Sequence, residues 1–204
     1  MWTTAVLLTL ALAGLPAPRQ AAGGAGPRAD RTADECLCNP DSVTETPCAA
    51  RRRALTSRER RAWREIQARI DATVEADKSE DLEAATRFNT PDFVAETTRG
   101  TTLSLADVKG HIQRNYDYII KIDDRTNVRI DCIVLEGSAA LVWINQHFVR
   151  TVPFGEDRTP RELVTNVTHE ETWVRTRTGW LRSRIKELRG GPYFLDGKPY
   201  APTP

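Results

Sequence analysis

The first regular pattern of the chain is an apolar stripe at helical spacing. Its members recur every three or four residues within a strongly charged segment. These positions are Trp63, Ile66, Ile70 and Val74. Just before them, Thr56 and Glu59 have the spacing of a capping box, in which two side chains cap the free backbone groups at the start of a helix. The pattern predicts a long amphipathic helix that begins near residue 56.

Two shorter helices and an extended segment are expected after the long helix. The apolar side of the first short helix comprises Leu82, Ala85 and Phe88. Pro91 blocks its continuation, and residues 92–98 are typical of a short extended segment that ends before Gly100. Ser104 and Asp107 form a second capping box, which predicts a third helix. The inward positions of that helix are Leu105, Val108 and Ile112.

From Thr126 onward the hydrophobic period drops to two, which is typical of strands. The four strand-like runs cover residues 127–137, 138–151, 161–176 and 179–188. Short connections favour an antiparallel meander. The expected fold class is therefore α+β, with a cone-shaped, curved antiparallel sheet wrapped around a long N-terminal helix and two shorter helices. Such a cone has a packed narrow end and an open mouth, where pockets form.

The N-terminal region has the features of a secretory signal peptide. Residues 5–15 are apolar but too few to span a bilayer, and small, flexible residues follow them. Residues 1–4 carry no Lys or Arg, so an uncleaved anchor or an N-terminal core helix is the alternative. No later segment is apolar enough to span a membrane, and the expected location is secreted or periplasmic. The expected organisation is a signal peptide at 1–25, a Cys-containing arm at 26–55, the α+β domain at 56–190 and a tail at 191–204.

Cysteine usage agrees with export. In an oxidising compartment Cys36 or Cys38 could form a disulfide with Cys48 across a short loop. Zinc binding is the weaker reading, because these three thiolates have no fourth ligand nearby. Cys132 lies in an apolar strand pattern and is expected to be a small buried hydrophobe.

The charges of the chain are balanced. Lys and Arg total 29 against 28 Asp and Glu, a formal net charge of +1. This balance creates no general field for nucleic acid or an anionic membrane, so no nucleic-acid partner is expected.

The candidate chemistry lies on the strand at 161–176. If Trp173 faces into the cone, alternation places Glu171 and His169 on the same side. The positions expected to share that side on the preceding strand are Trp143, Asn145 and His147. Antiparallel pairing would join the two sets into an acid–base cluster, where burial could raise the pKa of the carboxyl group.

A register shifted by one residue, which would turn the other face of these strands into the cone, remains an alternative. It would turn the His and Glu side chains toward solvent or a dimer face. The side chains inside would then be Val142, Ile144, Phe148, Thr172 and Val174. A metal site of His147, His169 and Glu171 has a known ligand set, but no closely spaced ligand pair supports it, and no metal or cofactor is expected.

The order of elements resembles the SnoaL-like and ketosteroid-isomerase-like proteins of the nuclear transport factor 2-like superfamily. The resemblance covers roughly residues 58–189. The features that carry it are Glu80, Asp81 and Leu82, the Pro-Asp-Phe at 91–93, Gly100 and the hairpin at 172–180. It implies the cone fold. It does not specify one function, because the superfamily hosts isomerases, dehydratases, epoxide hydrolases, cyclases and plain binding or assembly domains.

The resemblance also implies positions for an isomerase site. In those isomerases a tyrosine and a protonated acid form an oxyanion hole while another carboxylate moves the proton. By pattern, Thr73 takes the position of the tyrosine and Glu171 that of the protonated acid. The position of the proton-transferring carboxylate falls near Thr97, with Glu96 beside it. Only Glu171 matches in chemistry, so steroid-type isomerisation is disfavoured.

Two hypotheses follow. The leading one is an exported SnoaL-like domain that binds a small, partly apolar organic ligand in its cone, with isomerase-, lyase- or cyclase-like acid–base chemistry. Its expected catalytic residues are Glu171, His169 and His147, and its expected ligand-binding residues are Trp143, Asn145, Trp173, Phe93 and Thr97. The alternative is a non-catalytic envelope interaction or assembly module. A homodimer through the outer sheet face is expected for it, since arginines alternate along the last hairpin. These arginines are Arg175, Arg177, Arg182 and Arg184.

Overall fold

A computed structural model describes residues 55–201. The expected signal peptide and nearly all of the expected arm lie outside this range. The first element is the long helix α2 (Ser57–Lys78), and both halves of its capping box are present. The Thr56 amide donates to Glu59 Oε2 at 2.8 Å, and the Glu59 amide donates to Thr56 Oγ1 at 3.2 Å. The capping-box prediction is therefore confirmed.

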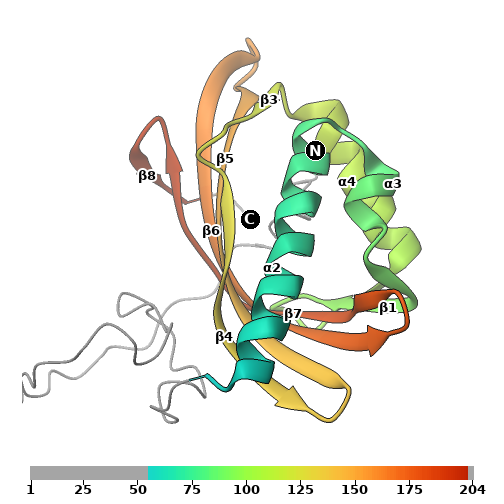
Figure 1. Cartoon of the computed structure of the whole chain (residues 1–204). Helices are drawn as coiled ribbons and strands as arrows, with labels where there is room; N and C mark the ends of the chain where they lie inside the picture. Colours follow the sequence, from blue (N-terminus) through green and yellow to red (C-terminus); the bar gives the residue numbers. More distant parts are fainter. Residues whose placement is uncertain (1–54, 202–204) are drawn as a thin grey trace, which may run out of the picture.

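Two shorter helices follow, as predicted. Helix α3 (Leu82–Thr86) is capped by Asp81, and helix α4 (Leu105–Tyr118) begins at the expected Ser104 capping box. All three helices lie on the concave side of the curved sheet, with α2 across its centre (Figure 1). No helix of residues 55–201 is both long and apolar enough to cross a bilayer.

The sheet contains eight described strands. They are β1 (Asn89–Glu96), β2 (Thr102–Ser104), β3 (Lys121–Ile122), β4 (Asn127–Glu136), β5 (Ala139–Phe154), β6 (Thr159–Thr176), β7 (Gly179–Leu195) and β8 (Lys198–Tyr200). Their order is β2-β1-β7-β6-β5-β3, with β4 paired to β5 and β8 paired to β7. The α+β cone is confirmed. The sheet is mixed rather than wholly antiparallel, because β1 runs parallel to β7.

The last strands are longer than the sequence predicted. The expected loop around Pro153–Pro160 is a four-residue turn, and the two prolines pair across the β5–β6 hairpin. Gly155 and Arg158 bend that turn with φ of 76° and 54°. The expected tail from residue 191 instead continues β7 to Leu195 and returns as β8. A turn with positive φ at Asp196 and Gly197 makes this hairpin possible.

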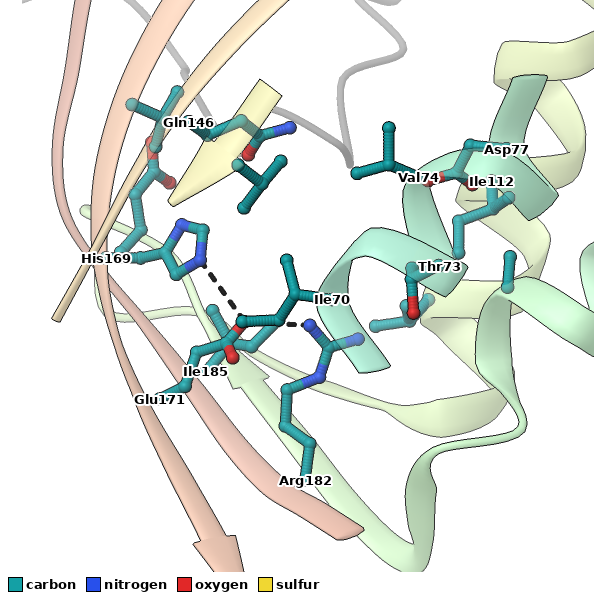
Figure 2. Close-up of a pocket in the computed structure, with 15 residues that line it drawn as sticks. Ile70, Thr73, Val74, Asp77, Ile112, Gln146, His169, Glu171, Arg182 and Ile185 are labelled. Atoms are coloured by element: carbon teal, nitrogen blue, oxygen red, sulfur yellow. Dashed lines mark hydrogen bonds and ion pairs between the residues drawn. The ribbon is translucent and has the colours of Figure 1, made fainter. Parts of the chain in front are cut away.

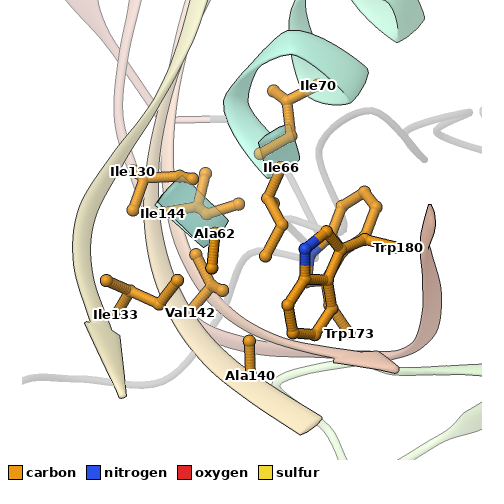
Figure 3. Close-up of a cluster of buried hydrophobic side chains, with 10 residues drawn as sticks. All are labelled: Ala62, Ile66, Ile70, Ile130, Ile133, Ala140, Val142, Ile144, Trp173 and Trp180. Carbon is orange, nitrogen blue, oxygen red and sulfur yellow. The ribbon is translucent and has the colours of Figure 1, made fainter. Parts of the chain in front are cut away.

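The main hydrophobic core lies between α2 and the sheet (Figure 3). Ile66 is fully buried, and the helix stripe packs on residues of β5, β6 and β7. Trp63, expected in that stripe, is only half-buried at its margin. A second cluster joins α4 to β1 through Phe93, Val108 and Ile112. The helices therefore pack on the concave face of the sheet through two separate clusters.

Candidate functional site

Strand β6 places Glu171 and Trp173 inside the cone. Both are 1% exposed, and His169 is 7% exposed. Trp173 packs in the core against α2, and His169 and Glu171 lie further along the same face. The predicted direction of these three alternating side chains is confirmed.

The prediction for the neighbouring strand is wrong. Ile144 pairs with His169 and Val142 with Glu171, so the even-numbered residues of β5 face inward. Directly paired residues of an antiparallel sheet share a face. Because the β5–β6 turn holds four residues, an odd-numbered residue pairs with an even-numbered one. The three odd-numbered candidates on β5 therefore lie on the outer face: Trp143, Asn145 and His147.

Those three side chains have structural contacts on the outer face. His147 Nδ1 lies 2.8 Å from Asn166 Oδ1, and Asn145 Oδ1 accepts a hydrogen bond from Thr168. Trp143 packs on Cys132. Cys132 is buried but is also disulfide-bonded, so the expectation of a simple small hydrophobe is incomplete. The metal-ligand set that included His147 is not assembled.

A cavity of about 80 Å³ separates the helices from the sheet. One water molecule occupies roughly 10–15 Å³ of such a cavity, so the cavity accommodates several waters or a small organic group. Its apolar walls include Ile70, Val74, Ile112 and Ile185. Figure 2 shows Asp77 on the helical side and His169 and Glu171 on the sheet side.

Glu171 is held as a buried carboxylate. Its Oε1 accepts from Arg182 Nη1 at 2.7 Å, and its Oε2 accepts from Trp173 Nε1 at 2.7 Å. His169 Nε2 lies 3.2 Å from Oε1, within ion-pair range but without hydrogen-bond geometry. Burial raises the pKa of Glu171, but Arg182 and His169 outweigh it and lower the pKa to about 2. The expected rise of this pKa is therefore wrong, and the group is a poor proton acceptor.

Arg182 belongs to the site and not to the outer surface. The register of β6 and β7 shifts between the pairs Thr172–Arg184 and Trp173–Arg182. Ser183 is the extra residue of this bulge, which lets Arg182 follow Trp173 inward. Arg182 Nε also donates to Asn89 Oδ1 at 2.9 Å. The expected run of outward arginines on the last hairpin is thus broken at Arg182.

Asp77 is a second acidic group of the cavity, and the sequence reading missed it. It is 1% exposed near the end of α2. Tyr116 Oη donates to its Oδ1 at 2.7 Å, while Oδ2 has no hydrogen-bond partner in the described structure. Burial raises the pKa of Asp77 to about 7, against the opposing effects of Tyr116 and Arg182. The available signal was its spacing, since Asp77 continues the apolar stripe three residues after Val74.

Glu187 is a third acidic group. It is 3% exposed and pairs across the sheet with His169. Neither carboxylate oxygen has a hydrogen-bond partner in the described structure. Burial raises the pKa of Glu187 to about 7; the Thr98 backbone opposes this rise without reaching hydrogen-bond geometry. The sequence carried no clear signal for Glu187. The bulge at Ser183 shifts the alternation of β7, so the inward-facing residues are even-numbered before Ser183 and odd-numbered after it.

Unpartnered polar atoms gather around this one cavity. Besides Asp77 Oδ2 and both oxygens of Glu187, they include Gln146 Nε2; His169 Nε2 also makes no hydrogen bond and has only its ion-pair contact with Glu171. A buried polar group without a partner costs about 1–3 kcal/mol. The arrangement therefore fits a molecule with an apolar body and several hydrogen-bonding groups.

The remaining expected ligand-binding residues, Phe93, Thr97 and Trp173, lie outside the cavity lining. Phe93 packs in the α4–β1 cluster, and Thr97 closes a turn by accepting from the Thr101 amide at 3.1 Å. Trp173 is not part of the lining, but it contacts two lining residues: it donates to Glu171, and the Arg182 guanidinium lies over its ring. Thr73 lines the cavity, but its hydroxyl donates to the Arg69 carbonyl oxygen. Within residues 55–201, no group of three or more His, Cys, Asp or Glu side chains is arranged to hold a metal ion.

A second cavity of about 270 Å³ lies next to the first. Asp77 lines both cavities, and its partner Tyr116 lines the second. Lys78, Lys121 and Asp124 make the second cavity more polar. Asp77 therefore stands between a mainly apolar chamber and a charged one.

Solved structures share this fold. A candidate dehydratase of the NTF2-like family from Streptomyces avermitilis matches with a TM-score of 0.52 and 14% identity, over 63% of this chain and 96% of that one. A candidate scytalone dehydratase from Novosphingobium aromaticivorans matches with a TM-score of 0.55 and 11% identity, over 64% and 85%. A protein from Kribbella flavida matches with a TM-score of 0.53 and 12% identity, over 65% and 94%. Neither a protein-family model nor a curated protein matches the chain.

The chain therefore has the nuclear transport factor 2-like fold, as the order of its elements indicated. At these identities the likeness describes the fold alone, and function has to be argued from the cavity.

Proposed function

We propose that the chain binds a small, partly apolar organic ligand in the cavity between α2 and the sheet. The observation that carries this proposal is the set of unpartnered buried polar atoms on otherwise apolar walls, above all both oxygens of Glu187. A ligand with a compact apolar body would fill the space, and its polar groups would pair with these atoms. The presence of Glu171 and His169 in the lining supports a ligand site over a purely structural module.

The proposal includes acid–base chemistry by Asp77 and Glu187. Proton transfer is most effective when the pKa of the catalytic group lies near the working pH, and burial raises both pKa values to about 7. Asp77 lies on α2 and Glu187 on β7, so one carboxylate could accept a proton while the other, protonated, donates one. Glu171 stays ionised and positions His169 and Arg182. Isomerisation or elimination of a small molecule needs such a pair, and two of the similar structures carry the name of candidate dehydratases.

Binding and exchange measurements test this function. Phenol, indole and 2-cyclohexenone are titrated while NMR follows the methyl groups of Ile70 and Ile112, both in the cavity lining. Deuterium incorporation at the carbon next to the ketone then reports proton transfer. Wild type should bind at least one probe and accelerate exchange, and Glu187→Gln and Asp77→Asn should reduce the exchange rate by about 10²–10⁴-fold.

His147→Ala is the matched control, because His147 lies on the outer face and away from the cavity lining. It should behave as wild type. If no probe shifts the cavity methyl signals, or if His147→Ala changes exchange as strongly as Glu187→Gln, the site is wrongly assigned.

We also propose that the chain is exported. The apolar segment at residues 5–15 and the disulfide at Cys132 both support this, since disulfides persist in oxidising compartments. Expression of the full chain, followed by fractionation and N-terminal sequencing, tests it. Export predicts a secreted or periplasmic product that begins after the apolar segment; an unprocessed intracellular product argues against it.

A further inference from the structure

The outer face of β4 and β5 buries a tryptophan where no helix of residues 55–201 lies. Trp143 and its neighbour Cys132 are each 4% exposed. Among the described residues, two other apolar side chains, Val134 and Leu141, pack on this pair, and both are partly buried. The helices α2, α3 and α4 all lie on the concave side (Figure 1). Neighbours in a sheet cover the flanks of an outward ring but not its top, so the described strands alone do not account for the burial of Trp143.

Cys132 indicates which part of the chain that is. Cys132 is disulfide-bonded, and it is the only cysteine of residues 55–201. The remaining cysteines of the chain are Cys36, Cys38 and Cys48. Within one molecule, the partner of Cys132 is therefore one of these three, and all three precede residue 55.

The start of the described chain lies within reach of Cys132. Arg58, in the first turn of α2, donates to the carbonyl oxygen of Gly137 at the β4–β5 turn. Cys132 lies five residues from Gly137 along β4, or roughly 17 Å at strand spacing. The seven residues from Cys48 to Leu55 span up to about 25 Å when extended. Even the nearest of the three cysteines can thus reach Cys132.

We propose that the segment of residues 36–54 crosses the outer face of β4 and β5, is joined to Cys132 by a disulfide, and covers Trp143. The segment occupies the face through which a homodimer was expected, so the disulfide-bonded chain does not dimerise there. A second copy is the weaker occupant, because four apolar side chains supply far less than the roughly 1,200–2,000 Å² of a stable interface. This inference is independent of the proposed ligand site.

Disulfide mapping of the oxidised full chain tests the connection. Digestion without reductant, followed by mass spectrometry, should show the Cys132 peptide linked to a peptide from residues 36–54. Serine substitution of the identified partner should leave Cys132 free, while substitution of either other cysteine should leave the link intact. A free Cys132 in wild type, or a link between the Cys132 residues of two copies, overturns the proposal.

Hydroxyl-radical footprinting tests the cover. In the oxidised wild type, both Trp143 and Trp173 should be protected. In Cys132→Ser, Trp143 should become several-fold more reactive while Trp173, which is 1% exposed on the other face, stays protected and reports an intact fold. If Trp143 stays protected in this variant, the disulfide does not hold the cover in place and the proposal fails. Concentration-dependent dimerisation of the oxidised wild type through this face contradicts it as well.

Discussion

Arg182 Nη1 lies 2.7 Å from Oε1 of Glu171, and both side chains point from the concave face of the sheet into the cavity. Glu171 is 1% exposed, so the guanidinium is its main compensating charge. This ion pair fixes the polarity of one cavity wall. The other two acids of the cavity, Asp77 and Glu187, form no such ion pair, and burial raises the pKa of each to about 7.

Arg182→Met should destabilise the fold by about 3–5 kcal/mol, because it leaves a buried carboxylate without its cation. Urea denaturation at pH 7 measures the change. Arg184→Met is the matched control on the same strand, since its ion pair with Glu96 is far more exposed and should contribute at most about 1 kcal/mol. Equal losses in the two variants would show that the buried pair has no special role.

Glu187→Gln should change how stability depends on pH. The folded-state pKa of Glu187 is raised from 4.5 to about 7, so the folded state favours the protonated form. The stability from this group is fully present below about pH 4.5 and is lost as the pH rises through 7. Glutamine removes that titration, and the variant should lose less stability than wild type between pH 4.5 and 8, by on the order of 1–3 kcal/mol.

Denaturation curves at several pH values measure this difference. Glu156→Gln, in the exposed β5–β6 turn, should retain the wild-type dependence. A Glu187→Gln curve parallel to that of wild type would mean that Glu187 does not titrate in this range.

Tyr116→Phe should raise the pKa of Asp77 above its value of about 7. The phenol donates to Asp77 Oδ1 at 2.7 Å and so stabilises the ionised form. An NMR titration of the Asp77 carboxyl carbon measures the shift directly. Tyr118→Phe is the control, because the Tyr118 hydroxyl donates to the Pro153 carbonyl oxygen instead. An unchanged or lowered pKa in Tyr116→Phe would contradict the assigned hydrogen bond.

Ile66→Ala should destabilise the protein by about 2–5 kcal/mol, since Ile66 is fully buried where α2 meets the sheet. Thermal or urea unfolding measures the loss. Ile120→Ala removes the same atoms from a side chain that is 53% exposed and should change stability by less than about 0.5 kcal/mol. A small effect at Ile66 would indicate that packing of α2 on the sheet contributes little to stability.

The sequence alone predicted the elements that depend on local pattern. The capping boxes at Thr56 and Ser104 identified two helix starts, and the stripe through Ile66 and Ile70 identified the helix face that packs on the sheet. Alternation predicted that Glu171 and Trp173 face inward together. These features follow from one segment at a time, because helix and strand geometry fix which neighbours share a face.

The tertiary structure decided which residues meet in the cavity. The four-residue turn between β5 and β6 sent His147 to the outer face, and the bulge at Ser183 brought Arg182 and Glu187 inward. The pKa of Glu171 depends on a charge from another strand, and that of Asp77 on burial under several elements. Strand register, bulges and desolvation arise from the packing of distant segments. The pattern within a single segment therefore determines the faces of each element, and only the assembled sheet and helices determine the site.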